Sequence, residues 1–303
     1  MKRILTAIVL VFATLGTHAQ LLYKFTRHGL KSPSYIVGTS HLAPVSFDDS
    51  IPGIRQAMAD TQQTYGELIM EGLMSPDSLA IMQQAMMMPD GMTIDKLLSA
   101  DEMNRLNAFM KELLGMDMTN PMLAQQMGKF LPSALSNTLS LLNFMKKTGG
   151  FDAQNVFDDY FQKEAHAQGK GVGGLETLDF QIGVLFKGQS LERQKELLMC
   201  QVDNAAFMDK MADGIIRAFY SQNLDAIKDA MDEKLHNSCD SSPEEENLLI
   251  YTRNADWLTK MPALMAQKPT LFAVGAGHLP GEKGVLHLLR QAGYTVEGVG
   301  QKK

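Results

Sequence analysis

The feature that most constrains the fold is a short pattern that occurs near both ends of the chain. Residues 35–44 read YIVGTSHLAP and residues 272–281 read FAVGAGHLPG, so the segments share valine, glycine, histidine and leucine at equivalent positions. Each begins with a β-rich or apolar run and is followed by a segment with helical spacing. A strand, a loop, a helix and a second strand in this order form a βαβ unit, and such units build parallel sheets. The sequence therefore predicts an α/β fold.

The other segments at each end support this interpretation. Residues 22–26 and 35–37 favour a hairpin with a turn around 29–33, and SIPGIRQAMADT favours a helix. The run TYGELIME is strand-like. Near the C-terminus, GEKGVLHLLRQAG favours a helix closed by Gly293, and YTVEGVG favours a last strand. We expect a mixed, largely parallel central sheet built from N- and C-terminal βαβ units.

The stretch between the two ends, about residues 75–265, has a mainly helical pattern. Ser99 followed by Glu102 is typical of a capping box, which predicts a helix over 102–114. A short strand is expected at 170–175. Because nothing divides this stretch cleanly from the ends, we expect residues 20–303 to form a single domain with a large helical insertion.

The first residues are typical of a signal peptide. Residues 1–19 combine the basic start MKR, a short apolar run and the small residues of THA before Gln20. A helix that crosses a bilayer needs about 20 apolar residues, and this apolar run is shorter, which favours a signal peptide. An uncleaved membrane anchor is the alternative interpretation. We expect cleavage before Gln20, export to a periplasm or to the medium, and no stable membrane span in the rest of the chain.

Composition restricts the class of protein. A hydrophobic content of 45% and a charged content of 20% are typical of a globular chain rather than a disordered one. The formal net charge of −6 argues against a nucleic-acid partner, which would call for a basic face.

Two cysteines, Cys200 and Cys239, lie outside the predicted signal peptide. An oxidising compartment allows them to form a disulfide, and two separate buried thiols are the alternative. Without a second pair of cysteines, this spacing is not a zinc-site pattern.

The two repeated histidines, His41 and His278, are the first candidates for chemistry. Ligands collect at the carboxyl ends of strands in open α/β sheets, and both histidines would lie there, after Gly38 and Gly275. We expect each glycine to let the chain turn sharply. Space at the loop is expected from the small neighbouring residues Thr39, Ser40, Ala276 and Gly277. If the two strands are adjacent, the histidines face one another; hydrogen-bonded structural histidines are the alternative.

Two imidazoles need a third ligand, commonly a carboxylate, to hold a divalent ion. Glu67 is the preferred candidate, because an acid inside a strand-like run is costly to bury unless it is paired or bound. Glu71 is expected on the same strand face, nearer the loop. A site of two histidines and one carboxylate suits manganese, iron, cobalt or zinc.

Methionine is unusually frequent, with 22 residues in the whole chain and a concentration between Met70 and Met127. Flexible thioethers can fill irregular gaps in a helical core, accommodate a peptide or lipid, or bind a soft metal. We expect the first of these roles.

Several segments in this order resemble the TraB/GumN family, whose animal relatives are the Tiki proteins. They are YIVGTSHLAP, the acid of YGELIM, GLETLDFQ, YTRNADWL and FAVGAGHLPGEKGVLHLL, and the resemblance runs from about residue 22 to residue 299. The resemblance implies a divalent-metal-dependent protease in which His41, His278 and Glu67 are required. It also implies that Glu176 and Arg253 with Asn254 lie near the same site, in a fold distantly related to the erythromycin esterases.

These residues suggest a metal-dependent hydrolase that acts on peptide or protein substrates. In this hypothesis Glu67 either completes the coordination of the ion or acts as general base. Arg253 stabilises an oxyanion and Glu176 orients a histidine, whereas a structural ion pair between them is the alternative. The competing hypotheses are a peptide-sequestering protein that uses the Met-rich helical region without cleavage, and an esterase that needs no metal.

Overall fold

The computed structural model describes residues 20–148, 152 and 155–300, and the predicted signal peptide lies outside them. A six-stranded sheet has the order β4-β3-β5-β2-β1-β6. The strands are β1 (Leu22–Thr26), β2 (Ser34–Thr39), β3 (Gln63–Gly66), β4 (Gly171–Gly174), β5 (Thr270–Gly275) and β6 (Thr295–Gly298). Strands β4, β3, β5 and β2 pair in parallel, and β1 runs antiparallel to β2 and β6. The predicted mixed, largely parallel sheet is confirmed.

The two ends of the chain meet in the middle of this sheet. Strand β2 pairs with β5 in a register that sets Gly38 opposite Val274 and Thr39 opposite Gly275. The repeated patterns therefore follow adjacent parallel strands, and both leave the sheet at the same edge. The chain reaches β3 through helix α1 (Ile54–Asp60) and β6 through helix α14 (Val285–Gln291).

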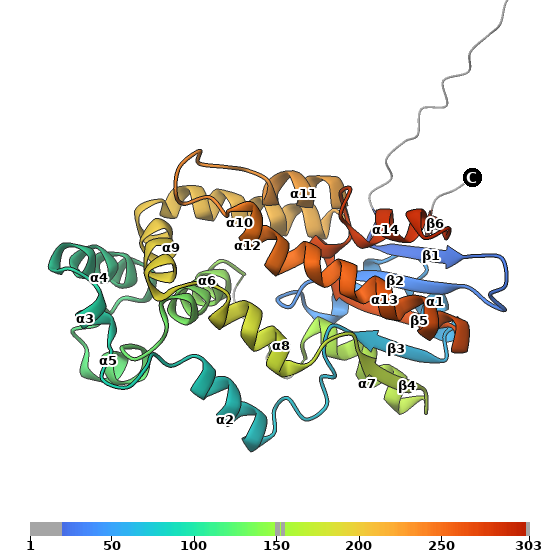
Figure 1. Ribbon diagram of the computed structural model, residues 1–303, viewed down its shortest axis with the longest axis horizontal. Coiled ribbons are helices and arrows are strands. Elements are labelled where there is room, and N and C mark those ends of the chain that lie inside the picture. The colour runs from blue at the N-terminus through green and yellow to red at the C-terminus, as the bar shows by residue number, and fades with distance from the viewer. Residues whose placement is uncertain (1–19, 149–151, 153–154, 301–303) are drawn as a thin grey trace, which may run out of the picture.

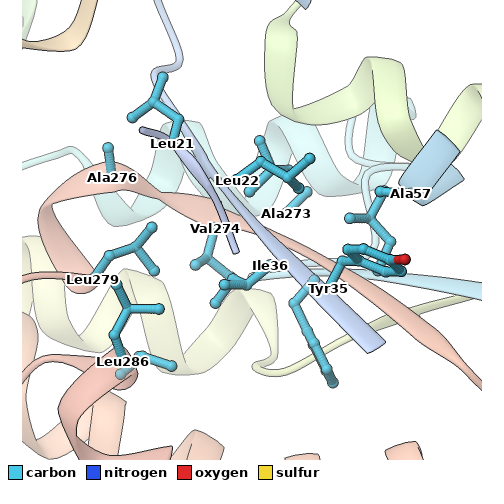
Figure 2. Packing of buried hydrophobic residues seen from close by; sticks show 14 of the residues in the cluster. Leu21, Leu22, Tyr35, Ile36, Ala57, Ala273, Val274, Ala276, Leu279 and Leu286 are labelled. Atoms are coloured by element: carbon cyan, nitrogen blue, oxygen red, sulfur yellow. The ribbon is translucent and has the colours of Figure 1, made fainter. Parts of the chain in front are cut away.

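A first hydrophobic cluster surrounds the sheet. It joins apolar side chains of the strands to those of α1, α7 (Phe157–Ala167), α13 (Thr252–Gln267) and α14. Figure 2 shows Ile36 and Val274 of adjacent strands beside Leu279 and Leu286. Helices α7 and α13 come from the stretch predicted as an insertion, so that stretch contributes to the core of the sheet.

A second hydrophobic cluster lies in the helical part, which extends away from the sheet (Figure 1). The remaining helices are α2 (Pro76–Ala85), α3 (Ile94–Leu97), α4 (Ala100–Leu114), α5 (Pro121–Met127), α6 (Pro132–Thr148), α8 (Leu178–Ile182), α9 (Leu191–Asp203), α10 (Ala205–Tyr220), α11 (Leu224–Met231) and α12 (Pro243–Glu246). Of these, α10 and α11 contribute buried side chains to the first cluster. Met88, Met110, Met118 and Met199 are buried in this cluster, as expected of gap-filling residues. Other methionines are exposed, including Met122 at 68%.

The predicted strand around Glu67 is the main error of the sequence interpretation. Strand β3 ends at Gly66, so Glu67 follows the strand and Glu71 lies exposed beyond it. The side chain of Gln162 gives the physical reason: its amide donates to Leu68 O at 2.7 Å and accepts from Met70 N at 3.0 Å. Because these backbone groups bond to a helix side chain, they do not extend the strand.

Several local predictions from the sequence are confirmed in the middle of the chain. The capping box at Ser99 and Glu102 is present, and α4 ends at Leu114 with Gly115, at a φ of 76°, as its C-terminal cap. The predicted strand at 170–175 is β4.

Cys200 of α9 and Cys239 form a disulfide. Within the part of the chain that the structure covers, no helix combines the length and apolarity needed to cross a membrane.

Candidate active site

The predicted site residues follow four neighbouring parallel strands. His41 comes after β2, Glu67 after β3, Glu176 after β4 and His278 after β5. Glu176 N donates to Glu67 O at 2.8 Å, so the hydrogen bonding between β3 and β4 continues past the ends of both strands. Parallel strands end at one edge of a sheet, so their following residues share that edge. Arg253 and Asn254 join them from the first turn of α13.

The two glycines of the repeated pattern act differently from the expectation. Gly275 has φ −50° and ψ 130°, which any residue adopts, so no sharp turn depends on it. A Cβ at Gly275 would lie 3.1 Å from Glu67 Oε1, and one at Gly38 would lie 3.0 Å from Ala276 Cβ. The glycines allow close approach, because a Cβ at Gly275 would crowd the Glu67 carboxylate.

Glu67 is held by several donors. Its Oε1 accepts from Gly275 N at 2.8 Å, and its Oε2 accepts from Arg253 Nη2 at 2.6 Å and from Gln181 Nε2 at 3.1 Å. Burial acts to raise the pKa of Glu67, but the charges of Arg253 and His41 and the hydrogen bond from Gly275 N outweigh it and lower that pKa below its ordinary value. The group is therefore a carboxylate near neutral pH.

Arg253 uses all its donors within the site. A guanidinium has five N–H groups. Two bond to Glu176 at 2.8 and 2.9 Å, one to Glu67 at 2.6 Å, one to Leu249 O at 3.0 Å and one to His278 Nε2 at 3.1 Å. To bind an oxyanion, Arg253 would have to release one of these partners. The ion pair that the sequence left as an alternative is the arrangement found.

Glu176 contacts Arg253 and Trp257 instead of a histidine. Its Oε1 accepts from Trp257 Nε1 at 2.8 Å, and its Oε2 also accepts from Gln181 Nε2 at 3.1 Å. The expectation that Glu176 orients a histidine is wrong for this geometry. The physical reason is the two-pronged pairing with Arg253, which uses the carboxylate oxygens and leaves the orientation of the histidines to other residues.

Asn254 orients His278. The amide nitrogen of Asn254 donates to the carbonyl oxygens of His278 and Lys283 at 3.2 and 2.9 Å, so its Oδ1 is the acceptor that faces His278 Nδ1 at 2.7 Å. His278 Nδ1 must then carry the proton, and Nε2 offers its lone pair to the site. Burial lowers the pKa of His278 to about 4, which keeps the ring neutral near pH 7.

Asp158 orients His41. Its Oδ2 lies 2.7 Å from His41 Nδ1, and its Oδ1 accepts from the hydroxyl of Thr39. The His41 ring is 68% exposed and Asp158 is 9% exposed. The charge of Asp158 raises the pKa of His41 to about 9, and water on the exposed side of the ring screens part of this pair.

Sequence reasoning missed Asp158 and Gln162, although a signal was present. The buried face of α7 consists of Phe157, Asp158, Phe161, Gln162 and Ala165. Two polar residues on an otherwise apolar helical face need polar partners, and here they are His41 and the backbone after β3. Gln181, which bridges Glu67 and Glu176, carried no such periodic signal.

The types of side chain at this site suit a divalent ion better than the distances between them do. Each histidine is held at Nδ1 by an oxygen, as is usual for metal-bound imidazoles, and Glu67 Oε1 lies 3.9 Å from His278 Nε2. His41, Glu67 and Arg253 line a pocket of about 80 Å³. Over the described residues, however, no three His, Cys, Asp or Glu side chains are arranged to hold a metal. Arg253 Nη1 faces the lone pair of His278 that an ion would need.

The chain is similar to known proteins over most of its length. The chain is 26% identical to "Metalloprotease TIKI2" of Danio rerio, 24% identical to "Metalloprotease TIKI1" of Danio rerio and 25% identical to "Metalloprotease TIKI1" of Homo sapiens. Each comparison covers 88% of this chain and 58%, 60% and 59% of the respective relative, so the chain spans about three fifths of their length. No solved structure matches significantly.

The sequence pattern of a whole family also matches. The model of the TraB/PrgY/gumN family aligns with residues 21–298, nearly the whole of the described chain. This range includes both Gly-x-x-His segments and the intervening acids and arginine. The chain therefore belongs to the TraB/PrgY/gumN family.

Proposed function

We propose that this protein is a divalent-metal-dependent hydrolase that cleaves peptide bonds. The observation that carries the proposal is the pair of histidines after adjacent parallel strands, each held at Nδ1 by an oxygen, with the Glu67 carboxylate close to His278. The metalloprotease names of relatives at 24% to 26% identity support the reaction class.

In this proposal His41, His278 and Glu67 hold the ion, which is manganese, cobalt, zinc or iron. When bound, a divalent ion lowers the pKa of a water from about 15.7 toward 7 and polarises a carbonyl. Asn254 and Asp158 position the two imidazoles. Arg253 and Glu176 position the Glu67 carboxylate, and Asn254 keeps the proton of His278 on Nδ1.

The site of action belongs to the same proposal. Residues 1–19 direct export and are removed, and the remaining chain works in a periplasm or outside the cell on peptide or protein substrates. An oxidising compartment agrees with the disulfide between Cys200 and Cys239.

The test is metal stoichiometry followed by cleavage. Residues 20–303 are purified, loaded separately with manganese, cobalt and zinc, and compared with His41→Ala and His278→Ala by elemental analysis. We expect about one ion per chain in the wild type, loss in both variants, and chelator-sensitive cleavage of a mixed peptide library. A wild type that takes up no ion under any loading contradicts the proposal.

A second candidate function rests on a separate groove in the helical part. Its volume is about 800 Å³, and its lining includes Met82, Met86, Met87, Met122 and Met127. Such a surface suits a non-catalytic protein that sequesters peptides. A sequestering protein keeps its affinity for peptides after chelation and after His41→Ala, whereas a hydrolase loses turnover under both treatments.

A further inference from the structure

A cavity of about 400 Å³ lies next to the candidate active site. Val184 and Leu185 line both this cavity and the small pocket that contains His41, Glu67 and Arg253. The two spaces therefore share part of one wall. The volume falls within the range of about 300 to 1,000 Å³ that is usual for ligand pockets.

Two π-helical turns line the cavity, and the first of them supplies the shared wall. They are η2 (Gly183–Lys187) and η3 (Asn247–Tyr251), and residues of both line the cavity. Single π-helical turns are rare and occur frequently at functional sites. The η3 turn is tied to the site because Leu249 O accepts from Arg253 Nη1 at 3.0 Å.

The η2 turn is held from the opposite side. Gln194 of α9 donates to the carbonyl oxygens of Phe186 and Gln189, both at 3.1 Å, and accepts from the Ser133 hydroxyl at 2.8 Å. Gly188 allows the two turns to pack, since a Cβ there would lie 2.3 Å from Leu248 Cδ2. The cavity walls are therefore held by hydrogen bonds from Arg253 of the site and from Gln194 of α9, which itself bonds to Ser133 of α6.

The lining is suited to an uncharged ligand. Apolar side chains from α9, α10 and the two π-helical turns line it, among them Leu185, Leu197, Met211, Ile215 and Leu249. Leu185 and Leu249 remain 43% and 46% exposed, so apolar side chains are accessible beside the site.

The charged residues of the lining are already paired. Glu245 bonds to Arg193, Glu246 to Lys234, and Asp232 to Lys228. A charged ligand would therefore have to compete with an existing partner, and an apolar one would not.

We propose that this cavity binds an uncharged, apolar segment of the peptide substrate, next to the bond that is cleaved. The inference rests on the proposed function for the identity of the substrate. It adds the substrate class: peptides with apolar residues beside the cleaved bond, in preference to acidic or basic ones.

The test measures binding and cleavage separately. The binding probe is a fluorescein-labelled heptapeptide with blocked ends and a Leu-Val-Phe centre, compared with one that has a Lys-Glu-Lys centre, in the presence of chelator. We expect Met211→Lys to weaken binding of the apolar peptide at least tenfold. Met74→Lys, the same change at an exposed methionine outside both the cavity and the Met-rich groove, is the matched control and is expected to bind as the wild type does.

Ile215→Asn repeats the test without adding a charge, and far-UV circular dichroism checks that each variant is folded. Equal binding of the two peptides by the wild type, or unchanged binding in both cavity variants, overturns the inference. Met122→Lys places the same charge in the Met-rich groove, and loss of binding in that variant alone also overturns the inference and assigns the peptide to the groove.

Cleavage separates this inference from the proposed function. If the cavity variants lose binding and the metal-loaded wild type cleaves neither peptide, the cavity assignment stands and the hydrolase proposal fails. If the wild type cleaves both peptides equally and Met211→Lys has unchanged kcat/KM, the hydrolase proposal stands and the cavity assignment fails.

Discussion

A single guanidinium links the residues of the candidate site. Arg253 is 7% exposed and pairs with Glu67 and Glu176, at 11% and 1% exposed. Sequence reasoning identified all three residues but not how they divide the work. The donor and acceptor directions that decide this depend on strands far apart in the chain, and no spacing in the sequence encodes them.

The first prediction follows from this burial. Arg253→Met leaves two buried carboxylates without their cation, so we expect the free energy of unfolding to fall by about 3 to 5 kcal/mol. Urea denaturation measures the change. Adding Glu176→Gln to Arg253→Met should restore part of the loss, because one unpaired charge is removed. A single variant as stable as the wild type would show that the cluster does not contribute to stability.

The second prediction concerns Asp158. Asp158→Asn weakens the hold on His41 Nδ1, and partners of this kind typically change metal affinity about 10 to 100-fold. Isothermal titration with manganese or zinc measures the dissociation constant. The matched control is Asp159→Asn, since Asp159 is the adjacent acid and pairs with Lys163 instead. Equal affinity in the two variants would argue against a positioning role for Asp158.

At the scale of elements, local signals in the sequence were sufficient for most helices and strands. The capping box at Ser99 and the closing glycine of α4 are contained within a few residues, so the sequence alone identifies them. The end of β3 is different, because it depends on Gln162 from a helix almost a hundred residues away. The predicted length of this strand was wrong because the residue that ends it is distant in the sequence.

The third prediction tests the Ser99 cap at the start of α4. Ser99→Ala removes the acceptor for Glu102 N, and we expect a loss of about 1 kcal/mol in the free energy of unfolding. Ser99→Asp keeps an acceptor at the same position and should retain most of the stability. Chemical denaturation of the three proteins gives the comparison, and equal losses in both variants would contradict the capping argument.

The fourth prediction concerns the disulfide between α9 and the segment after α11. Replacing Cys200 and Cys239 by alanine frees a loop with a sequence separation of 39, and the chain-entropy model gives a loss of roughly 3 to 4 kcal/mol. Thermal unfolding with and without reductant measures the effect. Reductant should lower the Tm of the wild type and leave the double variant unchanged.

At the scale of the whole molecule, the question is whether the sheet and the helical part unfold together. We propose that residues 20–303 form a single domain. Support comes from α7, β4 and α13, which belong to the predicted insertion in sequence and to the sheet or its core in space. The sheet is therefore incomplete without the middle of the chain.

The fifth prediction follows from this arrangement. Trp257, the single tryptophan of the chain, is buried in the cluster around the sheet, whereas far-UV circular dichroism reports mainly on the helices. We expect the two signals to change at the same urea concentration in one cooperative transition. Separate midpoints would show two independently folding units.

The sequence by itself determined what is local or periodic: the α/β class, the repeated strand and Gly-x-x-His pattern, the capping box and the identities of the acids and histidines. These follow from neighbouring residues, whose spacing and conformational preferences are written along the chain. Only the tertiary structure decided that Glu176 and Glu67 share Arg253, that Asn254 and Asp158 orient the histidines, and that an apolar cavity adjoins the site. The physical reason is that these contacts join the ends of parallel strands to helices from the middle of the chain, and hydrogen-bond direction across such distances exists only once the chain is folded.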